Sequence, residues 1–319
     1  MHEFELIKKY FSKISINNKS SLNLNDDVFF DKKKGLVIST DTYIEGNHFL
    51  DFKKPHLVIK KIIRSSISDL ICKGVKPKYY FISGSGNKKT FTKKNLFKIS
   101  KSLKDEQKKF NISLCGGDTT FSNKLSFTIT SVGYSKEIIY RNKTKLNDDI
   151  YVTGNLGDSF VGLQILRNKM KFNKSINDYF IKKYFIPDIQ IKLPLKILNF
   201  ANSSIDISDG IIADLEKLIN NQNHSYKIFL EKIPLSRNLS NLVKNQNFKK
   251  SNLISNGDDY QILFTANPGK SRIIENTARI YGVKISKIGK ITLGNKNSSI
   301  LNEKGEEIHI KSRGYIHNF

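Results

Sequence analysis

The sequence of 319 residues has no tryptophan, two methionines and only two cysteines. Cys72 and Cys115 are too few for a disulfide framework, and neither belongs to a Cys-x-x-Cys metal motif, so we expect a reducing compartment, the cytoplasm. No apolar run approaches the roughly 20 residues that a membrane-spanning helix needs. The first five residues include two acids, where a signal peptide needs cations. These absences predict a cytoplasmic protein with no membrane segment.

Acidic side chains are also scarce. The sequence has 29 of them and 54 basic side chains, which gives a formal net charge of +25. Such a balance makes nucleic acid the first partner to consider. Only seven of the basic residues are arginine, however, and the lysines are scattered in twos and threes along the whole chain. Proteins that recognise bases and phosphates usually do so through two-point hydrogen bonds from the Arg guanidinium. We therefore expect no nucleic-acid partner, although a basic nucleic-acid-binding protein remains the alternative from a different class.

Hydrophobic residues make up 38% of the chain, which is enough for a globular protein with a real core, and the length suggests two domains. Strand and helix patterns alternate in both halves, which predicts two α/β domains and leaves the order of strands open. The stretch 140–149 shows no periodicity and is the best candidate for a linker. We place the domains at residues 1–140 and 146–319.

Elements are predicted along the chain from hydrophobic periodicity and from helix start and stop signals. The predicted helices cover residues 4–14, 55–73, 93–110 and 160–170, with another beginning near 211; the predicted strands cover 35–41, 112–115, 125–130, 150–153, 205–207, 261–265 and 283–293. Within the second helix, Ser65, Ser66 and Asp69 lie on the same face as Ile62, at helical spacing. An unpaired carboxylate on a packed face is costly, so Asp69 is a candidate functional residue.

Aspartates recur at predicted strand ends and turns, beside small, hydroxylic or glycine neighbours. They are Asp27, Asp41, Asp69, Asp118, Asp206 and Asp209. Gathered carboxylates repel one another unless a hard cation lies between them, and Mg²⁺ takes oxygen ligands with phosphates completing its shell. The pattern indicates a magnesium–nucleotide site, although aspartate also favours ordinary turns and helix caps. No Walker loop is present, but Gly116-Gly117-Asp118-Thr119-Thr120 combines backbone freedom with oxygen ligands.

Six motifs in this order resemble the thiamine-monophosphate kinase family, of the aminoimidazole ribonucleotide synthetase-like superfamily. They are Ser39-Thr40-Asp41-Thr42, Gly46-Asn47-His48-Phe49, Ser68-Asp69-Leu70, Gly116-Gly117-Asp118-Thr119-Thr120, Tyr151-Val152-Thr153-Gly154 and Asp206-Ile207-Ser208-Asp209-Gly210. The resemblance covers nearly the whole chain. It implies an N-terminal mixed-sheet domain that binds ATP, a C-terminal α/β domain, and a homodimer formed through the N-terminal domains.

The resemblance also implies a reaction and a set of site residues. ATP and thiamine monophosphate would give thiamine diphosphate and ADP by direct in-line transfer, with several magnesium ions. The implied metal ligands are Asp27, Ser39, Thr40, Asp41, Asp69, Asp118, Asp206 and Asp209; the implied ATP contacts are Gly117, Asp118, Arg141 and Ser208; the implied substrate contacts are His48, Asp258 and Ser312; and the residues assigned to catalysis are Asp118, Arg141 and Asp209.

Two departures from the family pattern fall on the substrate side. The family's Gly-Gly-Glu-Asp-Tyr-Glu is here Asn256-Gly257-Asp258-Asp259-Tyr260-Gln261, which shortens one carboxylate, and an aromatic position of the family falls at Ser312, where Tyr315 or Phe319 could substitute. The nearest alternative is another ATP-using enzyme of this superfamily, a selenophosphate or aminoimidazole ribonucleotide synthetase. The first of these would be expected to carry a reactive N-terminal cysteine, and residues 1–71 contain none.

Overall fold

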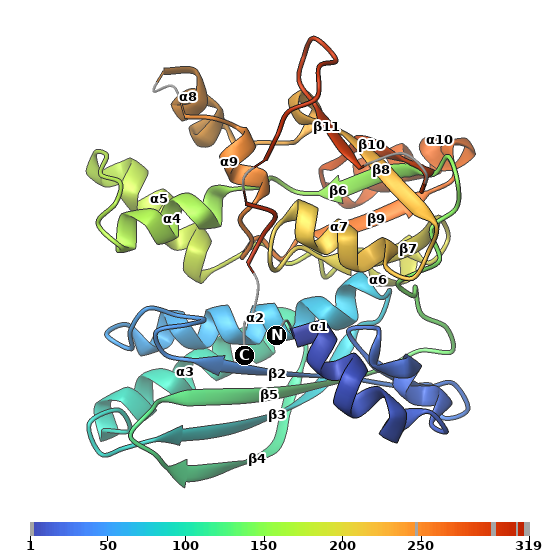
Figure 1. Cartoon of the computed structure of the whole chain (residues 1–319). Helices are drawn as coiled ribbons and strands as arrows, with labels where there is room; N and C mark the ends of the chain where they lie inside the picture. Colours follow the sequence, from blue (N-terminus) through green and yellow to red (C-terminus); the bar gives the residue numbers. More distant parts are fainter. Residues whose placement is uncertain (1–2, 246–247, 295–297, 311, 316–319) are drawn as a thin grey trace.

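Two mixed β-sheets organise the computed structural model, which describes residues 3–245, 248–294, 298–310 and 312–315 (Figure 1). Figure 1 shows them as two layers, one in each half of the chain, with helix α2 (Pro55–Cys72) between them. This arrangement confirms the predicted mixed α/β class. Among the described residues, no helix combines the length and the apolar character needed to cross a membrane.

The first sheet has five strands in the order β1-β2-β5-β3-β4. They are β1 (Phe29–Asp31), β2 (Leu36–Ile44), β3 (Pro77–Gly86), β4 (Ser113–Phe121) and β5 (Ser126–Tyr134). Only the β3–β4 pair is parallel, and α3 (Lys93–Phe110) makes the crossover between these two strands. Helices α2 and α3 cover one face, where Ile59, Ile63 and Leu103 join the core. The edge strand β4 is exposed along its whole length.

The second sheet has six strands in the order β11-β8-β10-β6-β9-β7. They are β6 (Asp149–Thr153), β7 (Ala201–Asp206), β8 (His224–Phe229), β9 (Ile262–Ala266), β10 (Ile285–Leu293) and β11 (Ser299–Leu301). The central strands β6 and β9 are buried on both faces. Phe264 packs toward α2 in one core, whereas Leu263 packs toward α7 (Ile211–Ile219) in the other.

Shorter helices complete both halves of the chain. They are α1 (Glu3–Leu6), α4 (Asp158–Leu166), α5 (Lys174–Phe185), α6 (Pro194–Ile197), α8 (Arg237–Asn245), α9 (Ser251–Ile254) and α10 (Ser271–Tyr281), with a π-helical turn at Ile7–Phe11 and 3-10 segments at Ser12–Ser15, Lys19–Leu24, Leu230–Lys232 and Pro268–Lys270. The predicted boundary at 140–146 lies between β5 and β6, so each sheet falls within one proposed domain.

Helix α2 joins the two layers through polar contacts. Lys61, Arg64 and Ser68 recur at helical spacing, so they face the second layer together. Arg64 donates to the carbonyl oxygen of Pro187 at 2.9 Å and forms a buried two-point ion pair with Glu106 of α3. The same helix begins at Pro55 and has an apolar side, as predicted, and this side packs on the first sheet.

Two segments differ from the sequence prediction. The predicted opening helix is helical but changes type, from α1 to a π-helical turn and then a 3-10 segment, and its Ile14 is 81% exposed. The strand predicted at 112–115 is longer in the structure, because the glycine-rich stretch 116–120 continues β4 as an extended edge strand. The reason lies in Gly117, because a Cβ atom there would come within 1.7 Å of the carbonyl oxygen of Ile82 on β3. The glycine thus allows close pairing of two strands.

Candidate active site

A cavity of about 600 Å³ opens between the two domains. Its first wall comes from the C-terminal half of β2 and from the Asp69 side of α2. Its second wall comes from α4, from the loop after β7 and from residues 255–260 before β9. Because each wall belongs to a different domain, a molecule bound here would contact both.

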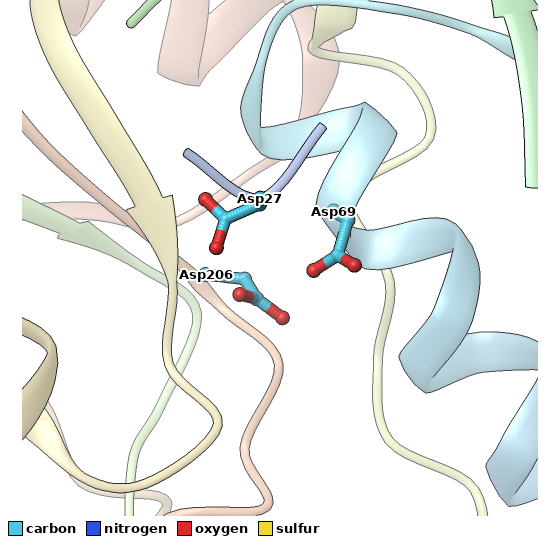
Figure 2. A group of neighbouring side chains, drawn as sticks. All are labelled: Asp27, Asp69 and Asp206. Carbon is cyan, nitrogen blue, oxygen red and sulfur yellow. The ribbon is translucent and has the colours of Figure 1, made fainter. Parts of the chain in front are cut away.

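Three carboxylates meet in this cavity, as Figure 2 shows for Asp27, Asp69 and Asp206. They come from the segment before β1, from α2 and from the end of β7. One oxygen of each lies within 4.8 Å of the others. Hydroxyl groups hold two of them in place, because Ser39 donates to Asp69 and Ser68 donates to Asp206. The donor set consists of oxygens alone, which suits a hard cation such as Mg²⁺.

The protonation of this group reflects its burial and its crowding. Burial raises the pKa of Asp206 to about 6. Burial likewise raises the pKa of Asp41 to about 6, opposed by a hydrogen bond from the Tyr43 hydroxyl at 3.1 Å. The pKa of Asp69 rises well above its ordinary value, first because of burial and then because of the charges of Asp41 and Asp206. Each ionised form needs a compensating positive charge.

Two basic side chains of the protein form ion pairs with Asp26 and Asp27. Lys73 lies at 2.8 Å from Asp26 and 2.7 Å from Asp27, and Arg141 forms an ion pair with Asp27. Lys73 has no exposed side-chain surface. Lys73 could not be predicted as a site residue, because nothing in its local sequence pattern shows that α2 ends beside residues 26 and 27.

The loop after β7 is organised by Asp214, a second site residue that was not predicted from the sequence. Its Oδ2 accepts hydrogen bonds from the backbone N–H groups of Ser208, Asp209 and Gly210 at 3.0–3.1 Å. Its Oδ1 pairs with Lys217 at 2.9 Å, and Lys217 also pairs with Asp209 at 2.5 Å. An acid in the first turn of a helix was the available signal. The network fixes Ser208 and Asp209 at the edge of the cavity.

The three predicted substrate contacts, His48, Asp258 and Ser312, line this cavity too. The Nδ1 atom of His48 accepts a hydrogen bond from the Ile44 backbone N–H at 3.0 Å, so the neutral ring carries its hydrogen on Nε2. Asp258 accepts from Lys61 at 2.7 Å and from the Tyr260 hydroxyl at 2.9 Å. Tyr315 also lines the cavity, whereas Phe319 lies outside the described residues.

The single chain does not bring every predicted residue to this cavity. The Thr40 side chain bonds to Thr130 at 3.0 Å on the other face of β2 from Asp41, and Thr40 does not line the cavity. Gly117 and Asp118 lie on β4, which is separated from β2 by β5 and β3. Strands in a sheet are about 4.8 Å apart, which puts β4 about 14 Å from β2.

Comparisons with known proteins agree with the family resemblance along the whole chain. Residues 25–135 match the family described as AIR synthase related protein, N-terminal domain. The thiamine-monophosphate kinases of Buchnera aphidicola subsp. Acyrthosiphon pisum (strain APS) and Escherichia coli (strain K12) are 33% and 31% identical to this chain. In both cases the alignment covers 99% of this chain and 98% of the relative.

A solved structure, AaThiL complexed with AMPPCP and TMP, has the same fold. It superposes with a TM-score of 0.84 at 26% identity, covering 99% of this chain and 97% of that one. The predicted two-domain fold of the aminoimidazole ribonucleotide synthetase-like type is therefore confirmed. Full-length similarity above 30% identity, together with this superposition, shows that the chain belongs to the thiamine-monophosphate kinase family.

Proposed function

We propose that this protein transfers the terminal phosphoryl group of ATP to thiamine monophosphate, giving thiamine diphosphate and ADP. The observation that carries the proposal is the meeting of Asp69 and Asp206, from different domains, in a cavity that also holds the predicted substrate contacts. An acceptor phosphate is already anionic at neutral pH and needs little help from a general base. The protein must then position two phosphates and balance their charge.

Asp69 and Asp206 are the proposed principal metal ligands, with Asp41 beside them and Asp209 at the solvent-facing edge. Magnesium ions, when bound, supply positive charge that screens the two phosphates and favours in-line transfer. Ser39 and Ser68 orient the two principal carboxylates through their hydroxyl hydrogens. The family resemblance implies several magnesium ions, and we propose that this protein also binds several.

Arg141 and Ser208 are the proposed ATP contacts from within the chain. Both line the cavity, on the side where the Asp214 network fixes the loop after β7. The Arg141 guanidinium can share its charge between Asp27 and a phosphate, because it carries five donors in a planar fork. This cation would stabilise charge that develops on the transferred group.

Gly117 and Asp118 are proposed to act from a second subunit, joined through the N-terminal domain. This proposal has support in the open face of the first sheet, where Thr40, Thr130 and Phe81 are register partners on β2, β5 and β3. Phe81 is 41% exposed there, and Phe121 at the end of β4 is 76% exposed. A homodimer that covers this face could carry Asp118 of one subunit to the cavity of the other.

Mixing two inactive variants tests the proposed homodimer. Asp118→Asn and Asp69→Asn chains should each be inactive alone, because each damages every site. After dissociation and random reassociation in equal amounts, about a quarter of the sites would combine an intact Asp69 with an intact Asp118 from the other chain. Activity near that fraction supports a shared site. Complete absence of activity in mixed dimers, verified by differently tagged chains, would contradict it.

His48 and Asp258 are proposed to hold thiamine monophosphate, with Ser312 at the rim. The Nε2–H of His48 can donate to an anionic phosphate oxygen. Asp258, held by Lys61 and Tyr260, can accept a hydrogen bond from an amino group of the substrate.

We also propose that the protein is located in the reducing cytoplasm, where ATP is available. The unbridged state of Cys72 and Cys115 supports this location.

Incubation of the purified protein with Mg–ATP and thiamine monophosphate tests the reaction itself. Thiamine diphosphate and ADP, separated by chromatography, should appear in equal amounts and disappear when a chelator removes the metal. Asp178→Asn, an exposed change on α5 that alters the net charge equally, is the matched control for Asp69→Asn. Binding of Mg–ATP with no formation of either product would show that the substrate assignment is wrong.

A further inference from the structure

Lys73, which directly follows α2, is held by three buried oxygen atoms. Its ammonium group contacts Asp26 Oδ1 at 2.8 Å, Asp27 Oδ2 at 2.7 Å and the carbonyl oxygen of Ser204 at 2.7 Å. An ammonium group has three donors, so all three are used. Ser204 lies on β7, and this contact therefore fixes the ammonium between the two domains.

Arg141 holds the same two carboxylates. Its backbone N–H donates to Asp26 Oδ2 at 2.9 Å, its Nε donates to Asp27 Oδ2 at 3.1 Å, and its Nη2 pairs with Asp27 Oδ1. All four carboxylate oxygens thus accept from Lys73 or Arg141. Two fixed positive charges match two fixed negative charges, and both aspartates are at least 90% buried.

We propose that the Lys73 ammonium takes the place of a divalent cation at the Asp26–Asp27 pair, so that Asp27 holds no metal ion in this protein. The inference rests on the metal site of the proposed function and disagrees with one ligand that the family resemblance implied. An ion bound to Asp27 would lie close to two immobile cations of the protein and be repelled by both. Mg²⁺ also demands near-ideal octahedral placement of its oxygen ligands, and both Asp27 oxygens are already directed to these cations.

The contrast with Asp69 and Asp206 supports this division. They accept hydrogen bonds from the neutral hydroxyls of Ser39 and Ser68, and within the described part of the chain neither forms an ion pair. Although one Asp27 oxygen lies within 4.8 Å of these two carboxylates, its charge is directed to Lys73 and Arg141. Divalent ions should therefore bind on the Asp69–Asp206 side.

Counting bound Mn²⁺ tests the proposal. Free Mn²⁺ is measured by electron paramagnetic resonance during titration of the full-length protein, in the presence of a non-hydrolysable ATP analogue. Asp27→Asn should bind as many ions as the wild type, and Lys73→Met should bind one more. Asp69→Asn should lose at least one ion, which shows that the count detects a true ligand. Loss of an ion in Asp27→Asn, or no gain in Lys73→Met, would overturn the proposal.

Thermal unfolding provides a second measurement. Without metal, Lys73→Met leaves two buried carboxylates with one counter-charge and should melt below the wild type. Mn²⁺ should then raise its melting temperature by about 5 °C more than it raises that of the wild type. Lys61→Met is the matched control, because Lys61 is also a buried lysine but pairs with the single carboxylate of Asp258. Its shift should equal the wild-type shift, and equal shifts in all three proteins would contradict the inference.

These readouts separate the inference from the proposed function. If the wild type binds no Mn²⁺ in the presence of the nucleotide analogue, the metal-dependent reaction is wrong, whereas an ion gained by Lys73→Met still supports the role of Lys73. If Lys73→Met does not fold, the count for Asp27→Asn decides alone.

Discussion

Asp206 should destabilise the metal-free protein at neutral pH, and replacing it with asparagine should remove that cost. Its pKa is about 6 in the folded protein, against an ordinary value of 3.8, and burial is the main cause. A raised pKa in the folded state means that the folded protein binds more protons than the unfolded chain between these two values. The free energy of unfolding therefore falls as pH rises through this window and levels off above about pH 6.

The size of the effect follows from the shift. One pKa unit corresponds to about 1.4 kcal/mol, so an Asp206 pKa near 6 costs roughly 3 kcal/mol once the group is ionised. Asparagine has nearly the same shape and keeps an oxygen that can accept the Ser68 hydroxyl hydrogen. Asp206→Asn should therefore raise the free energy of unfolding by about 2–3 kcal/mol at about pH 7.5 and by almost nothing near pH 4.

Urea unfolding of the wild type and Asp206→Asn, in chelator and at both pH values, measures the difference. The exposed change Asp178→Asn serves as the control for net charge. Adding Mg²⁺ should stabilise the wild type and leave Asp206→Asn nearly unchanged, because the variant lacks a proposed ligand. Equal or lower stability of the variant at neutral pH in chelator would show that Asp206 carries no ionisation cost.

Three further substitutions address other parts of the site. Asp118→Asn should lower turnover at least about 100-fold with an unchanged circular dichroism spectrum, and wild-type activity would remove Asp118 from the site. His48→Ala should mainly raise the KM for thiamine monophosphate, so steady-state constants that match the wild type would exclude His48. Asp214→Asn should cost about 3 kcal/mol in urea unfolding, because Lys217 and three N–H groups lose a buried charged partner; a cost below about 1 kcal/mol would contradict this.

The sequence predicted the elements that depend on local periodicity. Helix α2 begins at Pro55 and ends just before the predicted stop at Gly74, and α3 has the predicted bounds. The face shared by Ile62 and Asp69 was also predicted, because helical spacing alone determines it. These features need no knowledge of which segments meet in space.

Features that depend on contacts between residues far apart in the sequence could not be predicted in the same way. The predicted strand ended at residue 115, but β4 continues through the two glycines, and its close approach to β3 is what requires Gly117. Lys73 acts on residues that the fold brings to it, Asp26, Asp27 and Ser204, and it belongs to no motif. The place of Asp118 on an edge strand, about 14 Å from β2, follows from strand order, which local patterns do not determine.

The cavity treats its carboxylates in two ways, and this division has a physical consequence. Asp26 and Asp27 are paired with Lys73 and Arg141, so the protein itself balances their charge. Asp41 and Asp206 instead have a pKa near 6, so their ionisation at neutral pH costs stability until a cation binds. Metal binding to Asp41 and Asp206 restores the stability that is lost when they ionise. The protein should therefore be most sensitive to Mg²⁺ above about pH 6 and least sensitive below it, because protons replace the metal there.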